Sequence, residues 1–104
     1  LGSIKHLIKL NASNNCLKFT FDFAPPANLE WVDYSVNQIA KITGSEKNPY
    51  LKYLYLDNNS IKHIDGLVTN KCLRVLSLNG NTIAKIENLE NLWIEELFIS
   101  ANNL

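Results

Sequence analysis

No run of apolar residues reaches the length of about 20 that a membrane-spanning helix needs, so no membrane segment is expected. Neither sign of charge is in excess, because ten lysines and arginines balance ten aspartates and glutamates. Proteins that bind nucleic acids or acidic membrane surfaces strongly usually carry a basic excess, so neither is expected as a partner. Only two cysteines are present, Cys16 and Cys72. This is more typical of a reducing compartment than of a small disulfide-stabilised extracellular domain.

Residues arranged as catalytic, metal-binding or phosphate-binding motifs are also lacking. His6 and His63 lie far apart in the sequence and lack the close spacing of a metal-binding motif. No catalytic Ser/His/Asp set, Cys/His pair, carboxylate pair or glycine-rich phosphate loop occurs at motif spacing. The sequence therefore predicts no enzyme activity, no metal, no cofactor and no small-molecule substrate.

Asparagine, by contrast, is abundant, with 15 of the 104 residues. Many asparagines occupy the ninth position of a pattern whose first, fourth, sixth and eleventh positions are apolar or aromatic. In the clearest copy these positions are Leu51, Leu54, Leu56, Asn59 and Ile61. Copies start at residues 7, 29, 51, 73 and 94, so the steps are 22, 22, 22 and 21 residues, and the last copy begins an incomplete repeat. This near-constant spacing indicates a repeat protein.

The centre of each copy alternates apolar and polar residues, which is the pattern of a β-strand with one buried face. A short strand cannot bury that face alone, but strands of successive repeats can pair in parallel over one continuous core. The asparagines would then form a column at the turn after each strand, where their amides bind backbone groups that no strand reaches. The column consists of Asn15, Asn37, Asn59, Asn81 and Asn102.

The remainder of each repeat, the return limb, must bring the chain back to the next strand. Isoleucines recur thirteen residues after the repeat start and are predicted to be buried: Ile42, Ile64 and Ile86. Two residues later come residue types that tolerate a positive φ, so a left-handed turn is expected there in every repeat. These positions are Asp22, Gly44, Gly66 and Asn88.

Some segments depart from this pattern. Residues 23–26, Phe-Ala-Pro-Pro, are predicted to form an extended corner. Ser45 stands where a leucine is expected, so its limb is predicted to be less well packed and more mobile. Residues 1–6 align with the close of a return limb and are interpreted as the tail of an earlier repeat, so a longer array is expected.

The repeat resembles the leucine-rich-repeat family over essentially the whole chain. Its period and the segment Ile64-Asp-Gly66-Leu67 resemble the intracellular 22-residue subclass that includes a regulator of protein phosphatase 1. Segments 23–29 and 93–97 resemble the repeat region of proteins that also carry a guanylate-kinase domain. The resemblance implies an α/β-type solenoid, a right-handed coil with a parallel concave β-sheet and short helical or irregular convex limbs. It also implies a cytoplasmic setting, associated with the cytoskeleton or cilia.

The third, fifth and seventh positions of the pattern point away from the core, onto the concave sheet. Aromatic side chains cluster there between carboxylates, a composition typical of interface hot spots. A partner offering apolar groups and lysine or arginine would suit this face, with cation–π contacts. The predicted partner-binding residues are Trp31, Asp33, Tyr53, Tyr55, Asp57, Val75, Glu96 and Phe98. Alternatively, the aromatics only stabilise the sheet through cross-strand contacts.

The sequence thus predicts a protein–protein interaction module that binds a protein or peptide on its concave sheet. One alternative is a regulatory or targeting arm of a guanylate-kinase-like protein whose catalytic domain lies outside this sequence. Another is an extracellular recognition receptor with the same fold.

Overall fold

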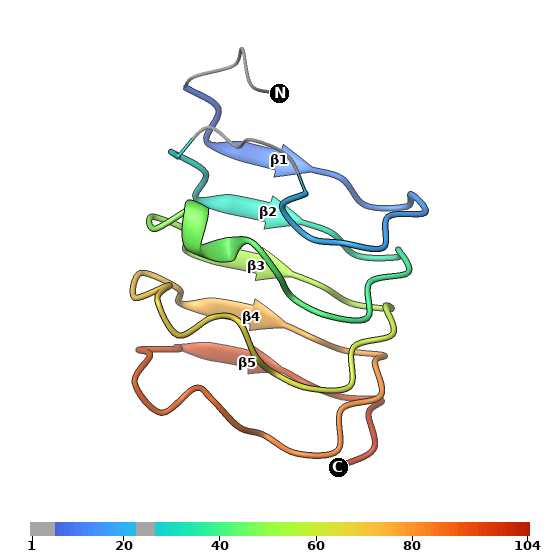
Figure 1. Ribbon diagram of the computed structural model, residues 1–104. Helices are drawn as coiled ribbons and strands as arrows, with labels where there is room; N and C mark the ends of the chain where they lie inside the picture. The colour runs from blue at the N-terminus through green and yellow to red at the C-terminus, as the bar shows by residue number, and fades with distance from the viewer. Residues whose placement is uncertain (1–5, 23–26) are drawn as a thin grey trace.

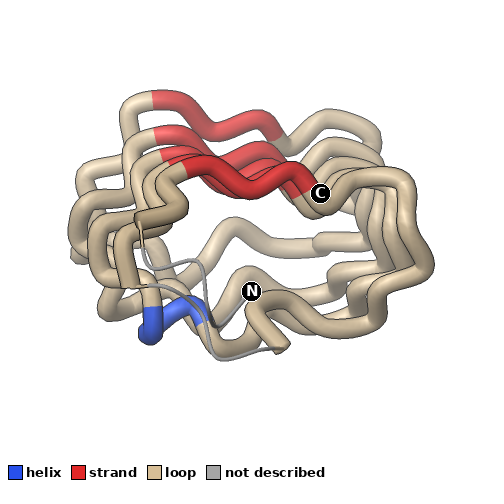
Figure 2. Tube along the Cα trace, turned by 90° about the horizontal axis from the view of Figure 1, so that it is seen from above, coloured by secondary structure: helices blue, strands red, loops and turns tan. Residues whose placement is uncertain are grey.

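The computed structural model describes residues 6–22 and 27–104. Five short strands form a parallel sheet in the order β1-β2-β3-β4-β5 (Figure 1). Their bounds are β1 Lys9–Asn11, β2 Trp31–Asp33, β3 Tyr53–Tyr55, β4 Val75–Ser77 and β5 Glu96–Phe98. Seen from above, the strands lie along one side of a coil and the return limbs along the opposite side (Figure 2). The chain is therefore a parallel-sheet solenoid, as the repeat predicts. The predicted extended corner, residues 23–26, and all but His6 of the predicted tail lie outside the described residues.

The strands pair residue for residue with the equivalent positions of the next turn. Leu54, for example, pairs with Val32 on one side and Leu76 on the other. The 21-residue step does not disturb this register, because Leu76 still pairs with Leu97. Two residues, 71 and 72, separate Asn70 from Leu73, whereas Trp93 alone separates Leu92 from Ile94.

The 21-residue repeat is one residue shorter than the others at this corner. Up to the corner, its return limb is equivalent to the limb one turn earlier. The Leu92 N–H donates to the Leu89 carbonyl at 3.0 Å, as the Asn70 N–H donates to the Leu67 carbonyl at 3.0 Å one turn earlier. The connection into β5 is therefore shortened at Trp93 alone.

The core lies between the sheet and the return limbs and is densest in the three inner turns. Val32, Leu54 and Leu76 are fully buried, whereas Leu10 and Leu97 pack against this core but stay partly exposed. The two outer strands have a sheet neighbour on one side only, which explains the difference. Because fully burying such a side chain contributes about 1.5–3 kcal/mol, the inner turns hold most of the stabilising apolar contacts.

The left-handed turn is confirmed at three of the four expected positions. Gly44, Gly66 and Asn88 have φ values of 76°, 77° and 61°. The prediction is wrong for Asp22, because the positive φ of the first limb belongs to Phe21, at 50°.

A threonine pair explains this shift by one residue. The Thr20 hydroxyl donates to the Thr43 carbonyl at 2.6 Å, and it accepts from the Thr43 N–H at 2.8 Å. These bonds hold Thr20 beside Thr43, so the next residue, Phe21, lies beside Gly44. A Cβ added at Gly44 would stand 3.1 Å from the Phe21 Cβ, so the left-handed residues still stack in space.

The limb that carries Ser45 is well packed, contrary to the prediction. Ser45 begins a short 3-10 helix, η1 (Ser45–Lys47), and both Ser45 and Asn48 are fully buried. The Ser45 hydroxyl donates to the Gly66 carbonyl at 2.6 Å, and the Asn70 amide donates to the Ser45 carbonyl at 3.0 Å. Polar contacts between turns thus replace the expected leucine.

The isoleucine anchors follow the prediction only in the inner turns. Ile42 and Ile64 are buried, whereas Ile86 is 52% exposed. Ile86 lies in the last described limb, and no further turn among the described residues packs against it. The position in the repeat therefore sets the direction of this side chain, and the neighbouring turn sets its burial.

Tyr34 occupies a core position that leucine fills in the next two turns. Its ring is 1% exposed and contacts Phe21 edge to face, with ring centroids 5.3 Å apart. Its hydroxyl oxygen accepts the Phe21 N–H at 2.9 Å. Burial raises the pKa of the Tyr34 phenol above its ordinary value, the Phe21 N–H opposes this, and the nearby Asp22 charge adds to it.

Tyr34→Phe is expected to lower the free energy of unfolding by about 1–3 kcal/mol at neutral pH, because the buried Phe21 N–H loses its acceptor. It is also expected to flatten the alkaline pH dependence. The raised pKa means that the folded state holds the phenol proton more tightly than the unfolded chain does. The contribution of the Tyr34 phenol to the free energy of unfolding is therefore fully present below the unfolded pKa of about 10. It is lost as pH rises through the folded pKa.

Urea denaturation at neutral pH and at a series of alkaline pH values measures both effects. Tyr50→Phe, which alters an exposed tyrosine, is the control and should change stability by less than about 0.5 kcal/mol. An alkaline slope that is the same in Tyr34→Phe and in the unmodified protein would contradict the assignment.

Candidate functional site

The outward positions of the strands form two rows across the concave sheet. The first row pairs Lys9, Trp31, Tyr53, Val75 and Glu96 in sequence, and the second pairs Asn11, Asp33, Tyr55, Ser77 and Phe98. Neighbours in a row lie about 4.8 Å apart, the spacing of adjacent strands. The structure thus brings the predicted strand residues onto one face, and Asp57 lies just beyond the end of β3.

The aromatic residues meet in the middle of this face. The Trp31 and Tyr55 rings lie diagonally across β2 and β3, with centroids 5.4 Å apart and planes tilted by 47°. Tyr53 is 37% exposed, and Phe98 on β5 is 42% exposed. A ring contact of this kind contributes about 0.5–1.5 kcal/mol beyond area burial, so Trp31 and Tyr55 are held in place before any partner arrives.

Lys9 adds a cation that the sequence-based site does not include. Its Nζ lies 4.3 Å from the centre of the Trp31 ring, a cation–π contact within the chain. The contact expected from a partner's cation is therefore already made at Trp31. A partner that covers Trp31 must displace Lys9 or pack beside it.

The carboxylates that flank the aromatics also hold turns: Asp33 holds the turn after its own strand, and Asp57 holds the turn after the next strand, β4. Asp33 Oδ1 accepts the Ser35 N–H at 2.8 Å. Asp57 Oδ1 accepts the Ser77 hydroxyl at 2.5 Å and the Asn79 N–H at 2.9 Å. Both carboxylates are thus fixed in position, and their negative charge stays at the edge of the aromatic cluster.

The two outward residues of β4 form the floor of the face. Val75 is 8% exposed and Ser77 is 3% exposed, while the paired side chains on the two neighbouring strands are larger. Val75 therefore offers a partner little surface, although the sequence places it among the binding residues. Glu96, paired with Val75 on the outer strand, is exposed.

The asparagine column ties each turn to the previous one beside this face. The Asn59 amide donates to the Leu56 carbonyl of its own turn and to the Tyr34 carbonyl of the previous turn, both at 3.1 Å. Its Oδ1 accepts the Ile39 N–H at 3.0 Å. Asn37, Asn81 and Asn102 repeat this arrangement. Asn15, in the first described turn, donates only to the carbonyls of Ala12 and Ser13 in the bonds of the described chain.

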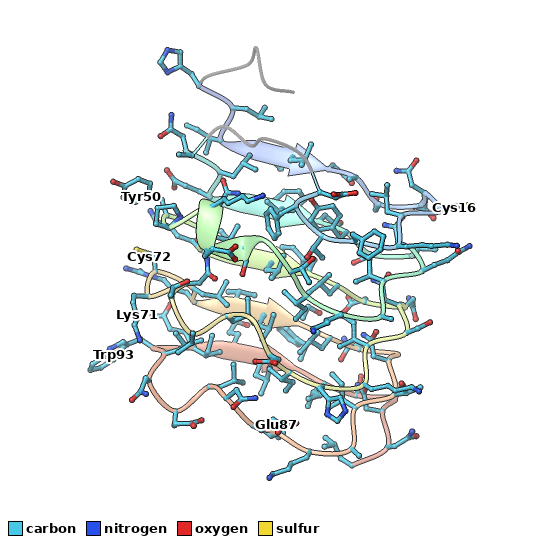
Figure 3. All side chains as sticks on the ribbon, viewed as in Figure 1. Cys16, Tyr50, Lys71, Cys72, Glu87 and Trp93 are labelled. Carbon is cyan, nitrogen blue, oxygen red and sulfur yellow. The ribbon has the colours of Figure 1, made fainter. Side chains whose placement is uncertain are left out.

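A second exposed surface lies where the chain enters the strands. Figure 3 shows Tyr50, Lys71, Cys72 and Trp93 along this flank and Cys16 on the opposite one. Both cysteines are free and exposed, so no disulfide joins them. The repeat pattern gives no signal for this flank, because Tyr50, Cys72 and Trp93 stand one position before its first residue.

The described ranges, 6–22 and 27–104, hold no group of three or more histidine, cysteine or acidic residues arranged to bind a metal ion. No helix within those ranges has the length and apolar character needed to cross a membrane.

Comparison with known proteins identifies the repeat. A family model for leucine-rich repeats, in two copies, matches residues 51–91, which include β3, β4 and the limbs that follow them. None of the curated proteins compared with the chain matches it significantly. The 22-residue subclass and the likeness to proteins with a guanylate-kinase domain stay predictions.

Proposed function

Because residues 51–91 match a family model for leucine-rich repeats, we propose that the concave sheet binds a segment of a protein partner. Leucine-rich-repeat domains generally mediate protein–protein interactions and are typically not catalytic. The observation that carries the proposal is the aromatic surface made by exposed Tyr53 with half-buried Tyr55 and Trp31, on a sheet whose register is fixed. A rigid aromatic surface loses little conformational entropy on binding, which favours affinity.

Sheet stabilisation accounts for only part of this aromatic cluster. Trp31 and Tyr55 contact each other and would strengthen a sheet without any partner. Tyr53 and Phe98, however, make no ring contact among the described residues and keep more than a third of their surface in solvent. Their exposure favours a binding role.

The charge of the face indicates the chemistry of the partner. Asp33, Asp57 and Glu96 outnumber Lys9, whose charge lies over Trp31. A segment that places an apolar side chain on Tyr53 and a lysine or arginine near Asp57 would complement both the aromatic surface and the charge. We therefore infer a basic segment with apolar residues as the partner's contact.

Trp31→Ala is expected to weaken partner binding by about 1.5–3 kcal/mol, roughly ten- to a hundredfold, because the cluster loses its largest ring. A photo-reactive amino acid at Tyr53 first captures the partner, which is then purified. Isothermal titration calorimetry compares its affinity for the unmodified protein and for Trp31→Ala.

Two controls make this test specific. A photo-reactive residue at exposed Lys85, on a return limb, should capture nothing, and Trp93→Ala should bind the captured partner normally. Equal capture from Lys85, or unchanged affinity in a folded Trp31→Ala variant, would remove the concave face as the binding site.

A further inference from the structure

The flank where the chain enters the strands combines an exposed aromatic surface with positive charge. We call it the entry flank and define it by Tyr50, Lys52, Lys71, Cys72, Arg74 and Trp93. Trp93 is 84% exposed and Tyr50 is 57% exposed. Single exposed apolar side chains are common, but exposed apolar surface rimmed by polar residues is typical of an interaction site. Figure 3 shows Trp93 projecting outward on the same side as Lys71, Cys72 and Tyr50.

The shortened corner of the last turn explains the exposure of Trp93. This residue spans alone the connection that Lys71 and Cys72 span together in the turn before. Leu92 before it and Ile94 after it are both partly buried against the core. With both neighbours directed inward, the Trp93 side chain projects into solvent.

A hollow of about 400 Å³ lies beside Trp93. The residues that line it are Lys52, Lys71, Cys72, Leu73, Arg74, Trp93 and Glu95. Leu73 lies beneath it and is fully buried, so the apolar surface open to a partner comes from Trp93 and from the stems of the cations. The hollow has room for one apolar side chain of a bound segment.

The charges around this hollow are unevenly paired. Lys52 forms an ion pair with Glu30 at 3.2 Å, whereas Lys71 contacts the Asn91 carbonyl at 3.5 Å. Neither Lys71 nor Arg74 has a carboxylate within ion-pair distance in the part of the chain that the structure describes. Glu95 is the one carboxylate among the lining residues, so the cations exceed the anions here.

We propose that the entry flank is a second interaction surface, which binds an acidic segment of a protein partner. An apolar side chain of that segment packs against Trp93, and its carboxylates face Lys71 and Arg74. The Arg74 guanidinium can hold a carboxylate through two parallel hydrogen bonds, and Lys71 adds a point charge. The surface is distinct from the concave face, and its charge preference is the opposite.

A peptide fits this surface better than a nucleic acid does. Nucleic-acid binding depends on several phosphate contacts made by a basic excess. The entry flank offers two unpaired cations next to an acidic residue, and the chain has no net charge. A few carboxylates around one apolar anchor match that number of cations.

The test uses a short fluorescent peptide of glutamates with a central leucine–phenylalanine pair. We expect it to bind the full chain in fluorescence anisotropy and to lose affinity as salt is added. Lys71→Glu combined with Arg74→Glu should weaken binding about tenfold or more, since two attractions become repulsions. Trp93→Ala should weaken it by a similar factor without changing the salt dependence.

Matched controls decide what is bound. Lys41→Glu with Lys62→Glu makes the same charge change on exposed return-limb residues and should leave peptide binding unchanged. Trp31→Ala should also leave it unchanged, which separates this surface from the concave face. The proposal is overturned by equal weakening in both double variants, by undiminished binding in folded Trp93→Ala, or by tighter binding of a single-stranded oligonucleotide than of the peptide.

Discussion

Asn81→Ala is expected to lower the free energy of unfolding by about 2–4 kcal/mol, a large effect for one side chain in a turn. Asn81 is 5% exposed, and its amide donates at 3.0 Å to the carbonyls of Leu56 and Leu78. Its Oδ1 accepts the Ile61 N–H at 3.0 Å. Alanine leaves the Ile61 N–H unpaired, which costs about 1–3 kcal/mol. Each carbonyl loses one of two donors, because the Asn59 amide still donates to Leu56 and the Asn102 amide to Leu78.

Urea denaturation followed by circular dichroism measures this change. Asn15→Ala is the matched control, because exposed Asn15 bonds only carbonyls of its own turn in the described structure, and we expect a loss below about 1 kcal/mol. Similar losses in the two variants would show that the bonds between turns add little to stability.

Gly66→Ala is expected to cost about 2–4 kcal/mol, for two independent reasons. Gly66 has a φ of 77°, which an alanine adopts only with strain. A Cβ there would also lie 2.6 Å from the carbonyl oxygen of Ile42 in the previous turn. That oxygen belongs to the backbone, so the two turns would have to separate.

Asn58→Ala separates the two causes. Asn58 has a φ of 55°, but it is exposed and already carries a Cβ, so alanine there tests backbone preference without introducing a new close contact. We expect a loss of about 1 kcal/mol or less for it. If thermal unfolding shifts equally in both variants, the close approach of Gly66 to Ile42 carries no energetic weight.

The strands and the composition of the concave face could be predicted from the sequence because the repeat fixes both. Once Leu54 and Leu76 are known to be equivalent, the residues on either side of each must pair as well. The paired rows on the face, including Trp31 beside Tyr53, follow from spacing alone. Predicting these pairs requires no knowledge of side-chain contacts between turns.

Features that depend on particular side-chain contacts could not be predicted in this way. The shift from Asp22 to Phe21 depends on the bonds between Thr20 and Thr43, and spacing gives no information about such bonds. The packing of Ser45 likewise depends on its hydroxyl reaching a carbonyl one turn away.

Details of the concave face and the entry flank likewise depend on particular side-chain contacts. The burial of Val75 depends on the size of its neighbours, and the position of Lys9 over Trp31 depends on a side-chain conformation. The entry flank gives no signal in the sequence, because its residues precede a copy of the pattern or occupy positions that the pattern leaves unspecified. Only the structure shows that Trp93 and the cations of the previous turn share one hollow.

The single-residue corner at Trp93 has a consequence for engineering the molecule. The corner is one residue shorter than its equivalent in the previous turn, yet β5 keeps its pairing with β4. An added residue at the corner should therefore also leave that pairing intact. An insertion between Leu92 and Ile94 would restore the longer connection of the previous turn and redirect the indole. The two surfaces can therefore be altered separately, one by substitution within strands and the other by the length of a corner.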